Sequence, residues 1–347
     1  MQQHRRRLIR SSAVMLALLL SVLLGLAAAP APSASAAGDA VRIAVPARSM
    51  SFSAIYVGQG KKFFEEQGLD LRVSVVAGIG ALQAMLAGST DFTGLTGTEV
   101  IKAHTKGLTP VVIAAGIERM SMEIIADKEK ATAAGVTESS SLQEKLRFMK
   151  GRTIGVLRTG AVAHFFLLYA AARGGLDPKT DLSIVSLGTP PALFASLEKK
   201  QIDAFVFVPP ISVIPVVKGY GLRLASGPLN TFPEIAPFPY ISLLTMAKTA
   251  QENPGLTRRM THAFVKGLRH IHSHPEESAA LVKAQFKDVP EPVLNESLRL
   301  VLPSHSKDGR ITLAAMETAQ KFLLDGGAID KPVDLSKTFT NDFLPKE

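Results

Sequence analysis

The stretch that decides the fold runs from residue 78 to residue 99 and reads GIGALQAMLAGSTDFTGLTGTE. Its apolar residues Leu82, Met85 and Leu86 recur at the spacing of one helical face, which predicts a short helix. The apolar run after Asp91 is a strand too short to be stable alone, so it must lie in a sheet. Glycine-rich turns begin the helix and follow the strand, where open α/β sheets bind ligands.

The same order of elements occurs twice along the chain. Gly-Leu-Asp at 68–70 precedes a strand, the helix and Asp91, and Gly-Leu-Asp at 175–177 precedes a strand, a helix and Asp203. Two similar β-α-β-α-β units predict an α/β protein with two lobes, each a mostly parallel sheet flanked by helices. The strand ends of both lobes should face a shared cleft. A single large α/β domain is the alternative.

The first 37 residues have the pattern of a cleavable signal peptide. Arginines at the start precede an apolar core at residues 13–26, which is too short to span a membrane comfortably. Small residues at 29–37 offer Ala-x-Ala cleavage sites, and we expect cleavage after Ala36 or Ala37. Since the arginines also resemble a twin-arginine signal, secretory and twin-arginine export both remain open. The mature protein is expected in the periplasm.

Composition excludes several classes of protein. The chain has no cysteine, which removes disulfides, thiolate metal sites, a cysteine nucleophile and a lipid-anchored cysteine. Without the four arginines of the signal peptide, 35 of its 39 basic residues remain and are scattered, so no nucleic-acid partner is expected. His270 and His274 share a helical face, but no carboxylate is placed to complete a metal site. We therefore expect neither metal nor cofactor.

Five runs carry a resemblance to a known family. They are IYVGQGKKFFEEQGLDL at 55–71 and the segments 80–92, 151–156, 159–164 and 193–204. These runs resemble the NMT1/THI5-like and sulfonate/taurine/nitrate-type solute-binding proteins of ABC transporters. The resemblance implies a type II periplasmic-binding-protein fold that bends at a hinge like a Venus flytrap, and no catalysis. It also implies a small-molecule solute and a membrane permease with its ATPase as partners, and we expect a monomer.

The chain departs from the family pattern at two places. Lys62 replaces a glycine, and Val-Pro-Pro at 208–210 replaces an aromatic-Glu-Pro sequence, so a polar contact common in relatives is missing. The resemblance divides the mature chain into 38–120 (lobe 1), 121–227 (lobe 2) and 228–347. The last segment is expected to return to lobe 1 and to cover it with helices.

The ligand site is expected in the loops after the strands. Free N–H groups at three helix starts there favour an anionic group on the ligand. Arg119 is expected to clamp this anion, and Glu99 to meet an amine, as in an aminosulfonate. A hinge arginine, a helix-start carboxylate and an ordinary helix histidine are the structural alternatives for Arg119, Glu99 and His164. The predicted ligand-binding residues are Ser49, Met50, Ser51, Phe52, Gly78, Ile79, Gly80, Thr96, Gly97, Thr98, Glu99, Arg119, Thr159, Gly160, Ala161, His164, Gly188, Thr189 and Pro209.

The sequence thus predicts an exported solute-binding protein of an ABC importer that captures a small anionic solute of sulfonate or carboxylate type. Taurine, nitrate and a thiamine-precursor pyrimidine stay open as solutes. An exported ligand-sensing module for a receptor is the alternative function. An enzyme is the least favoured reading, because the Cys-rich motif of the related pyrimidine synthase is absent.

Overall fold

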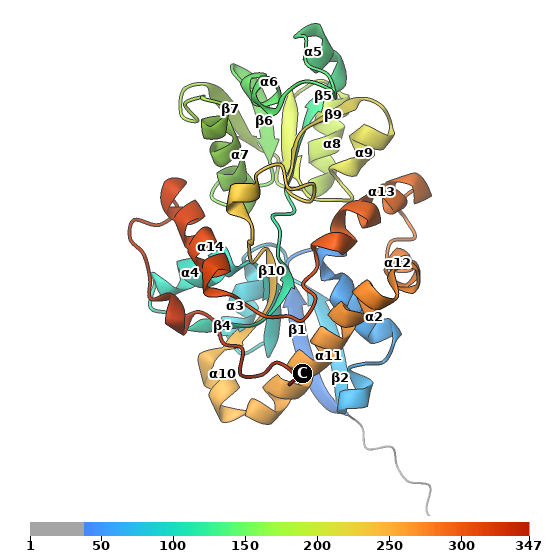
Figure 1. Cartoon of the computed structure of the whole chain (residues 1–347), viewed down its shortest axis with the longest axis vertical. Coiled ribbons are helices and arrows are strands. Elements are labelled where there is room, and N and C mark those ends of the chain that lie inside the picture. Colours follow the sequence, from blue (N-terminus) through green and yellow to red (C-terminus); the bar gives the residue numbers. More distant parts are fainter. Residues whose placement is uncertain (1–37, 347) are drawn as a thin grey trace, which may run out of the picture. The chain divides into compact units, whose positions relative to one another are not determined.

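Ten strands form two five-stranded sheets in the computed structural model, which describes residues 38–346 (Figure 1). The predicted signal peptide lies outside the described residues. The strands are β1 (Asp39–Val45), β2 (Leu69–Val75), β3 (Phe92–Leu95), β4 (Pro110–Ile117), β5 (Glu123–Asp127), β6 (Arg152–Val156), β7 (Leu182–Ser186), β8 (Ala204–Phe207), β9 (Gly221–Ser226) and β10 (Ile241–Met246).

The two sheets share one topology. The first has the order β2-β1-β3-β10-β4 and the second the order β7-β6-β8-β5-β9. In each sheet four strands run parallel and one, β10 or β5, runs antiparallel to its two neighbours. Strands β1, β2 and β3 therefore correspond to β6, β7 and β8, as the sequence repeat indicates. The predicted α/β fold with two lobes is confirmed.

Helices flank both sheets (Figure 1). Among them, α3 packs on β1 and β3, α4 on β4, α7 and α8 on β8, and α11 on α2 and β4. They are α2 (Ser53–Gly60), α3 (Gly80–Leu86), α4 (Gly97–His104), α5 (Lys128–Ala133), α6 (Leu142–Arg147), α7 (Val162–Arg173), α8 (Pro190–Glu198), α9 (Val213–Val217), α10 (Ala247–Glu252), α11 (Pro254–Ser273), α12 (Pro275–Lys283), α13 (Glu291–Val301) and α14 (Leu313–Asp325). Short 3₁₀ turns are η1 (Met50–Phe52), η2 (Glu65–Gln67), η3 (Pro233–Ile235), η4 (Leu302–Ser304) and η5 (Leu335–Lys337). None of the helices within residues 38–346 combines the length and hydropathy needed to cross a bilayer.

The chain passes between the sheets twice, after β4 and after β9. Each passage leads directly into the antiparallel strand of the next sheet. This strand is β5 after the first passage and β10 after the second. Because an antiparallel strand begins where its parallel neighbours end, both passages reach the edge that carries the strand-end loops. The expected lobe limits at residues 120–121 and 227–228 fall within these two passages.

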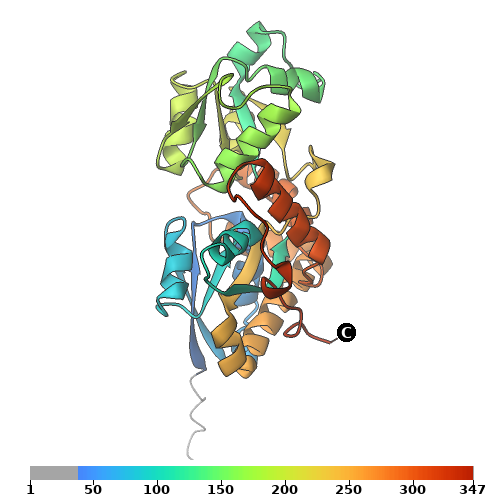
Figure 2. The same ribbon diagram turned by 90° about the vertical axis from the view of Figure 1, so that its left-hand side faces the viewer.

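The C-terminal helices were expected to cover the first lobe, and two of them also contact the second lobe. α13 packs on α9 of the second lobe through a buried cluster of Val213, Val293 and Leu300. α14 lies between α4 of the first lobe and α7 of the second, and Figures 1 and 2 both show this placement. Both helices also contact the first lobe, α13 at η1 and α14 at α4, so they pack against the two lobes together.

Two local features lie outside the regular pattern of the sheets. Asp127 caps α5 by accepting a hydrogen bond from the Lys130 N–H at 2.8 Å. Helix α2 ends at Gly60. Lys62, which stands where the family has glycine, has a φ of 60°, so the backbone keeps the left-handed conformation that glycine favours.

Candidate functional site

The strand-end loops of the two lobes enclose a cavity of about 180 Å³, here called the inner cavity. Its walls are mostly apolar. The first lobe contributes Pro46, Ala47, Ser49, Ser51, Phe52, Gly78, Ile79, Leu95, Thr96, Glu99, Tyr240 and Ile241, and the second lobe with the passage before it contributes Met122, Leu157, Arg158, Ala161, Val162, Ala163, Phe207 and Val208.

Apart from the Glu99 carboxylate, the polar side chains of the inner cavity on the first lobe are hydroxyls. Ser49 begins η1 and its Oγ accepts from the Ser51 N–H at 3.2 Å, which fixes the loop after β1. Thr96 caps α4 and its Oγ1 lies 2.5 Å from the Thr98 Oγ1. Burial raises the pKa of the Tyr240 phenol, so this group remains a neutral hydrogen-bond donor. Such groups can orient a polar ligand atom but carry no charge.

Arg158 brings a positive charge to this cavity. It follows β6 on the second lobe and reaches Gly78 of the first lobe, where an added Cβ would lie 3.7 Å from Arg158 Nη2. A planar guanidinium binds carboxylate, sulfonate or phosphate oxygens in pairs. Arg158 is therefore the residue in the cavity wall best suited to an anion.

The glycine N–H groups expected to receive the anion are already bonded. The Gly78 N–H donates to the Pro46 carbonyl at 3.2 Å, and the Gly80 N–H to the Ala77 carbonyl at 3.1 Å. In the second lobe the Gly188 N–H donates to the Leu157 carbonyl at 3.1 Å. The prediction that these N–H groups are free is wrong, because the loops satisfy their own backbone.

His164 has the same effect on the next loop. Its Nδ1 accepts from the Gly160 N–H at 3.3 Å, and burial lowers its pKa, so the ring is a neutral acceptor. Thr159 is tied to β7, since its N–H donates to the Ser186 Oγ at 3.2 Å. His164 thus supports the loop and does not line the inner cavity.

The structure brings together only part of the predicted set. Eight predicted residues line the inner cavity: Ser49, Ser51, Phe52, Gly78, Ile79, Thr96, Glu99 and Ala161. Thr159 and Gly160 line an adjoining hollow. Outside both are Met50, Gly80, Gly97, Thr98, His164, Gly188, Thr189 and Pro209.

Arg119 lies at the passage between the lobes, away from the inner cavity. It lines a minute hollow with Met120, Gly227 and Phe232 instead. The sequence marked a basic residue near the hinge but gave no information on which edge of the sheet it would face. Its predicted role as the anion clamp therefore lacks support from the geometry.

Sequence reasoning missed Arg158, Tyr240 and Met122. Arg158 directly precedes Thr159 and Gly160, so its place in a strand-end loop was a usable signal. Tyr240 and Met122 precede the antiparallel strands β10 and β5, and the start of such a strand lies beside the ends of its parallel neighbours. Recognising these strands as antiparallel would have placed both residues at the site.

Glu99 does not offer a free carboxylate. Lys102, one turn later on α4, donates to the Glu99 Oε1 at 2.9 Å, and both side chains are largely buried. An ammonium group on a ligand would have to compete with this ion pair. The arrangement thus disfavours the predicted contact between Glu99 and an amine.

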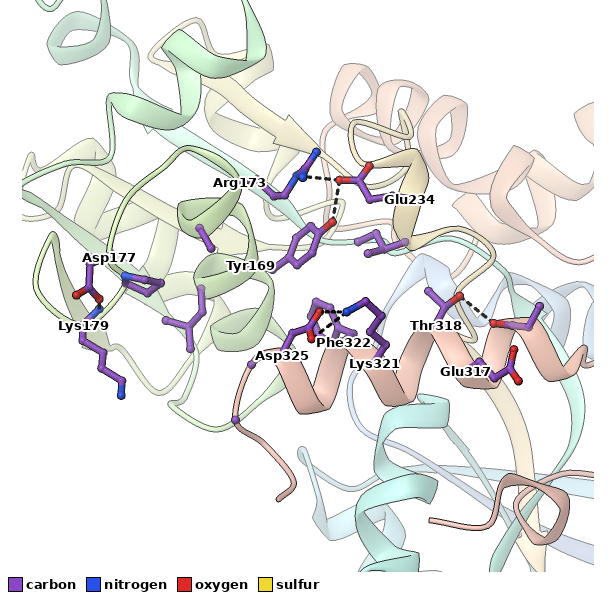
Figure 3. A pocket seen from close by; sticks show the side chains of 17 residues that line it. Tyr169, Arg173, Asp177, Lys179, Glu234, Glu317, Thr318, Lys321, Phe322 and Asp325 are labelled. Atoms are coloured by element: carbon purple, nitrogen blue, oxygen red, sulfur yellow. Dashed lines mark hydrogen bonds and ion pairs between the residues drawn. The ribbon is translucent and has the colours of Figure 1, made fainter. Parts of the chain in front are cut away.

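A larger hollow of about 1070 Å³ lies between α7 of the second lobe and α14 (Figure 3). Its central polar groups satisfy one another. The Tyr169 hydroxyl donates to the Glu234 Oε1 at 2.8 Å, and the Arg173 Nε lies 3.0 Å from the same oxygen. Because Glu234 belongs to η3 in the return passage, these contacts link the passage to α7. Strand-end loops do not line this hollow, so it is not the candidate site.

No metal centre is evident in the described part of the chain, where no three acidic or histidine side chains gather closely enough. The His270 and His274 rings stack with centroids 4.4 Å apart. His270 Nε2 lies 2.8 Å from the Glu277 Oε2, so this ring nitrogen already has a hydrogen-bond partner within the protein.

The fold and the cavity between two similar lobes are those of a periplasmic binding protein. The sequence model described as "NMT1/THI5 like" matches residues 49–278, and the chain belongs to this family. Over 340 residues it is 23% identical to the riboflavin-binding protein RibY of Chloroflexus aurantiacus, covering 92% of this chain and 90% of that one.

Solved structures with the same fold include a binding protein and an enzyme. The periplasmic aliphatic sulphonate binding protein SsuA of Escherichia coli has a TM-score of 0.68 and 19% identity, with 86% of this chain and 96% of that chain covered. The desulfurization enzyme DSZB has a TM-score of 0.63 and 14% identity, with 88% and 97% covered. At these identities the likeness establishes the fold alone.

Proposed function

We propose that this chain is an extracytoplasmic solute-binding protein of an ABC importer. It captures a small anionic organic solute in the inner cavity and presents it to a membrane permease. The proposal includes export to the periplasm through the signal peptide at residues 1–37, and binding without catalysis.

The observation that carries the proposal is that both lobes line one cavity. Phe52 and Tyr240 come from the first lobe, and Arg158 and Phe207 from the second. A solute that contacts both lobes binds most tightly when the lobes are together, so it shifts the population toward that arrangement. A permease can then distinguish loaded from empty protein.

The energy required is modest. A micromolar affinity corresponds to about 8 kcal/mol of net binding free energy. A charge-assisted hydrogen bond to a guanidinium contributes about 1.5–3 kcal/mol. Burial of an apolar body contributes roughly 25 cal/mol per Å² of area removed from water. Both contributions favour the capture of a dilute solute.

Within residues 38–346, the hydroxyls and the histidine near the site are not arranged for catalysis. The chain has no cysteine, and the hydroxyls of Ser49 and Ser51 in the cavity bond to each other at 3.2 Å. A nucleophilic serine would need a base within hydrogen-bond reach. His164 occupies its Nδ1 with the Gly160 N–H.

The test is a thermal-shift and calorimetric screen of the protein beginning at Gly38, against sulfonates, carboxylates, nitrate and thiamine precursors. We expect an organic anion to raise the unfolding midpoint and to bind with a 1:1 stoichiometry. Ala161→Trp should abolish binding, since Ala161 lines the inner cavity. Thr318→Trp, in the hollow of Figure 3, is the matched control and should bind normally. Turnover of the bound compound, or equal loss in both variants, would contradict the proposal.

A further inference from the structure

The inner cavity borders a second hollow, here called the outer compartment, of about 360 Å³. Ile79, Glu99 and Arg158 line both spaces, so the two are neighbours. The rest of the outer compartment comes from α3, from α4 and the turn after it, and from the loop after β6, and it includes Lys102, Lys106 and Leu108.

The charges of the outer compartment are unbalanced. Lys102 is neutralised by Glu99, but no ion pair among residues 38–346 involves Lys106 or Arg158. Two cations without carboxylate partners therefore face one hollow. Leu108 beside them has 37% of its surface exposed, which gives this space an apolar wall as well.

The inner cavity, in contrast to the outer compartment, has few basic side chains. Its only basic side chain is Arg158, which stands at the boundary with the outer compartment. The loop N–H groups of Gly78, Gly160 and Gly188 that were expected to bind an anion are bonded within the protein. An anionic group buried deep in the inner cavity would therefore lack a charged partner.

The volume of the inner cavity limits what can enter it. An apolar protein cavity of roughly 150 Å³ holds a benzene molecule. A space of about 180 Å³ thus admits one aromatic ring or a short alkyl chain between Phe52, Phe207 and Tyr240. A larger ligand must extend into the outer compartment.

We infer that the outer compartment is a second subsite and that the solute binds with its anionic group outward, between Arg158 and Lys106, and its apolar end in the inner cavity. This inference rests on the proposed function and assigns an orientation to its ligand. The solute is an organic anion with an apolar body about the size of one ring and without an amino group beside the anion. Arg158 is the residue that discriminates for the charge.

The experiment is isothermal titration of three probes: benzenesulfonate, inorganic sulfate, and benzyl alcohol as the uncharged analogue. We expect benzenesulfonate to bind at least tenfold more tightly than either of the others. Arg158→Gln should weaken its binding tenfold or more, and Lys106→Gln severalfold. Raising the salt from 0.05 to about 0.5 M should weaken binding to the unmodified protein more than to Arg158→Gln, because partly exposed charges are screened.

Controls separate the orientation from the proposed function. Lys248→Gln removes an exposed charge on α10, outside both compartments, and should leave the affinity unchanged. If benzenesulfonate binds and Arg158→Gln binds it equally well, the orientation is wrong while the proposed capture of organic anions stands. If sulfate binds as tightly as benzenesulfonate, the inner cavity is not the apolar subsite. If no anion in the probe set or in the wider screen binds, both proposals fail.

Discussion

Asp91 and Asp203 hold the same position in the two lobes. Asp91 Oδ2 accepts from the Arg42 N–H of β1 at 2.9 Å, and Asp203 Oδ2 accepts from the Thr153 N–H of β6 at 2.8 Å. In return, the Asp91 N–H donates to the Arg42 carbonyl at 2.9 Å and the Asp203 N–H to the Thr153 carbonyl at 2.8 Å. The sequence repeat therefore extends to individual hydrogen bonds at the start of β3 and β8.

Asp203→Ala should lower the free energy of unfolding by about 2 kcal/mol. The change leaves the Thr153 N–H and Lys130, whose Nζ lies 2.6 Å from Asp203 Oδ1, without their acceptor. Asp203→Asn keeps an oxygen for the Thr153 N–H but loses the ion pair. Its loss of unfolding free energy should therefore be smaller than that of Asp203→Ala. Urea denaturation followed by circular dichroism measures both. An alanine variant as stable as the asparagine variant would show that the backbone contact contributes nothing.

Arg223→Met should cost about 3 kcal/mol, because it leaves a buried carboxylate unpaired. Glu123 is fully buried at the start of β5, where it accepts from the Arg223 Nε at 2.6 Å and from the Ser212 Oγ at 2.7 Å. The double variant Glu123→Leu/Arg223→Met has no unpaired charge and should recover most of the loss. Urea unfolding of the three proteins tests the coupling. If the double variant is no more stable than Arg223→Met, the loss of stability in Arg223→Met does not come from the unpaired carboxylate.

His305 should make the protein less stable in mild acid. Burial lowers the pKa of this ring to about 4, although hydrogen bonds to the carbonyls of Leu302 and Val301 oppose the shift. From about pH 6.5 down to 4 the unfolded chain binds a proton that the folded chain does not, so stability falls as the pH falls. The total effect is about 3 kcal/mol. His305→Asn keeps a donor but does not titrate, and its unfolding free energy measured across this range should fall less steeply. Parallel curves for the two proteins would disprove this role.

The sequence repeat predicted the two sheets because Gly-Leu-Asp and the later aspartates recur where the chain turns and where β3 and β8 begin. The N–H groups of Gly78 and Gly188 were misjudged for a physical reason. Their acceptors, the carbonyls of Pro46 and Leu157, lie about thirty residues earlier in the chain and become neighbours only when parallel strands pair. Local spacing contains no such information.

The positions of single side chains could be predicted only where the strand direction was known. Ser49, Phe52 and Thr96 follow parallel strands, and all three reach the inner cavity. Arg119 lies in a passage whose path depends on the packing of both lobes, so its surroundings could not be inferred. α13 is amphipathic in sequence, but its pattern does not say which lobe will cover the apolar face.

Two glycines of α11 should respond in opposite directions to alanine. An added Cβ at Gly267 would lie 2.4 Å from the carbonyl oxygen of Ala54 in α2, a backbone atom that cannot rotate away. Gly267→Ala must push α11 from α2, and we expect a loss of about 2–3 kcal/mol, in the range of overpacked cores. Gly255, in the first turn of the same helix, has open space around its Cβ position.

Gly255→Ala is thus the matched control and should stabilise the protein by up to about 1 kcal/mol through the higher helix propensity of alanine. Thermal and urea unfolding of both variants measure the two changes in stability. A gain of stability in Gly267→Ala would mean that the two helices do not touch at this point.

Gly94 controls the position of a wall of the inner cavity. An added Cβ at this position of β3 would lie 2.7 Å from the Phe52 Cε1 and 3.2 Å from the Cδ1. Gly94→Ala must move the Phe52 ring, and Phe52 lines the inner cavity. We expect binding of an organic anion to weaken about tenfold, measured by calorimetry, with a stability loss of about 1–2 kcal/mol. Phe52→Leu in the same chain shortens the obstructing side chain, so the double variant should bind better than Gly94→Ala alone. If Gly94→Ala binds the anion as the unmodified protein does, Phe52 does not bound the ligand.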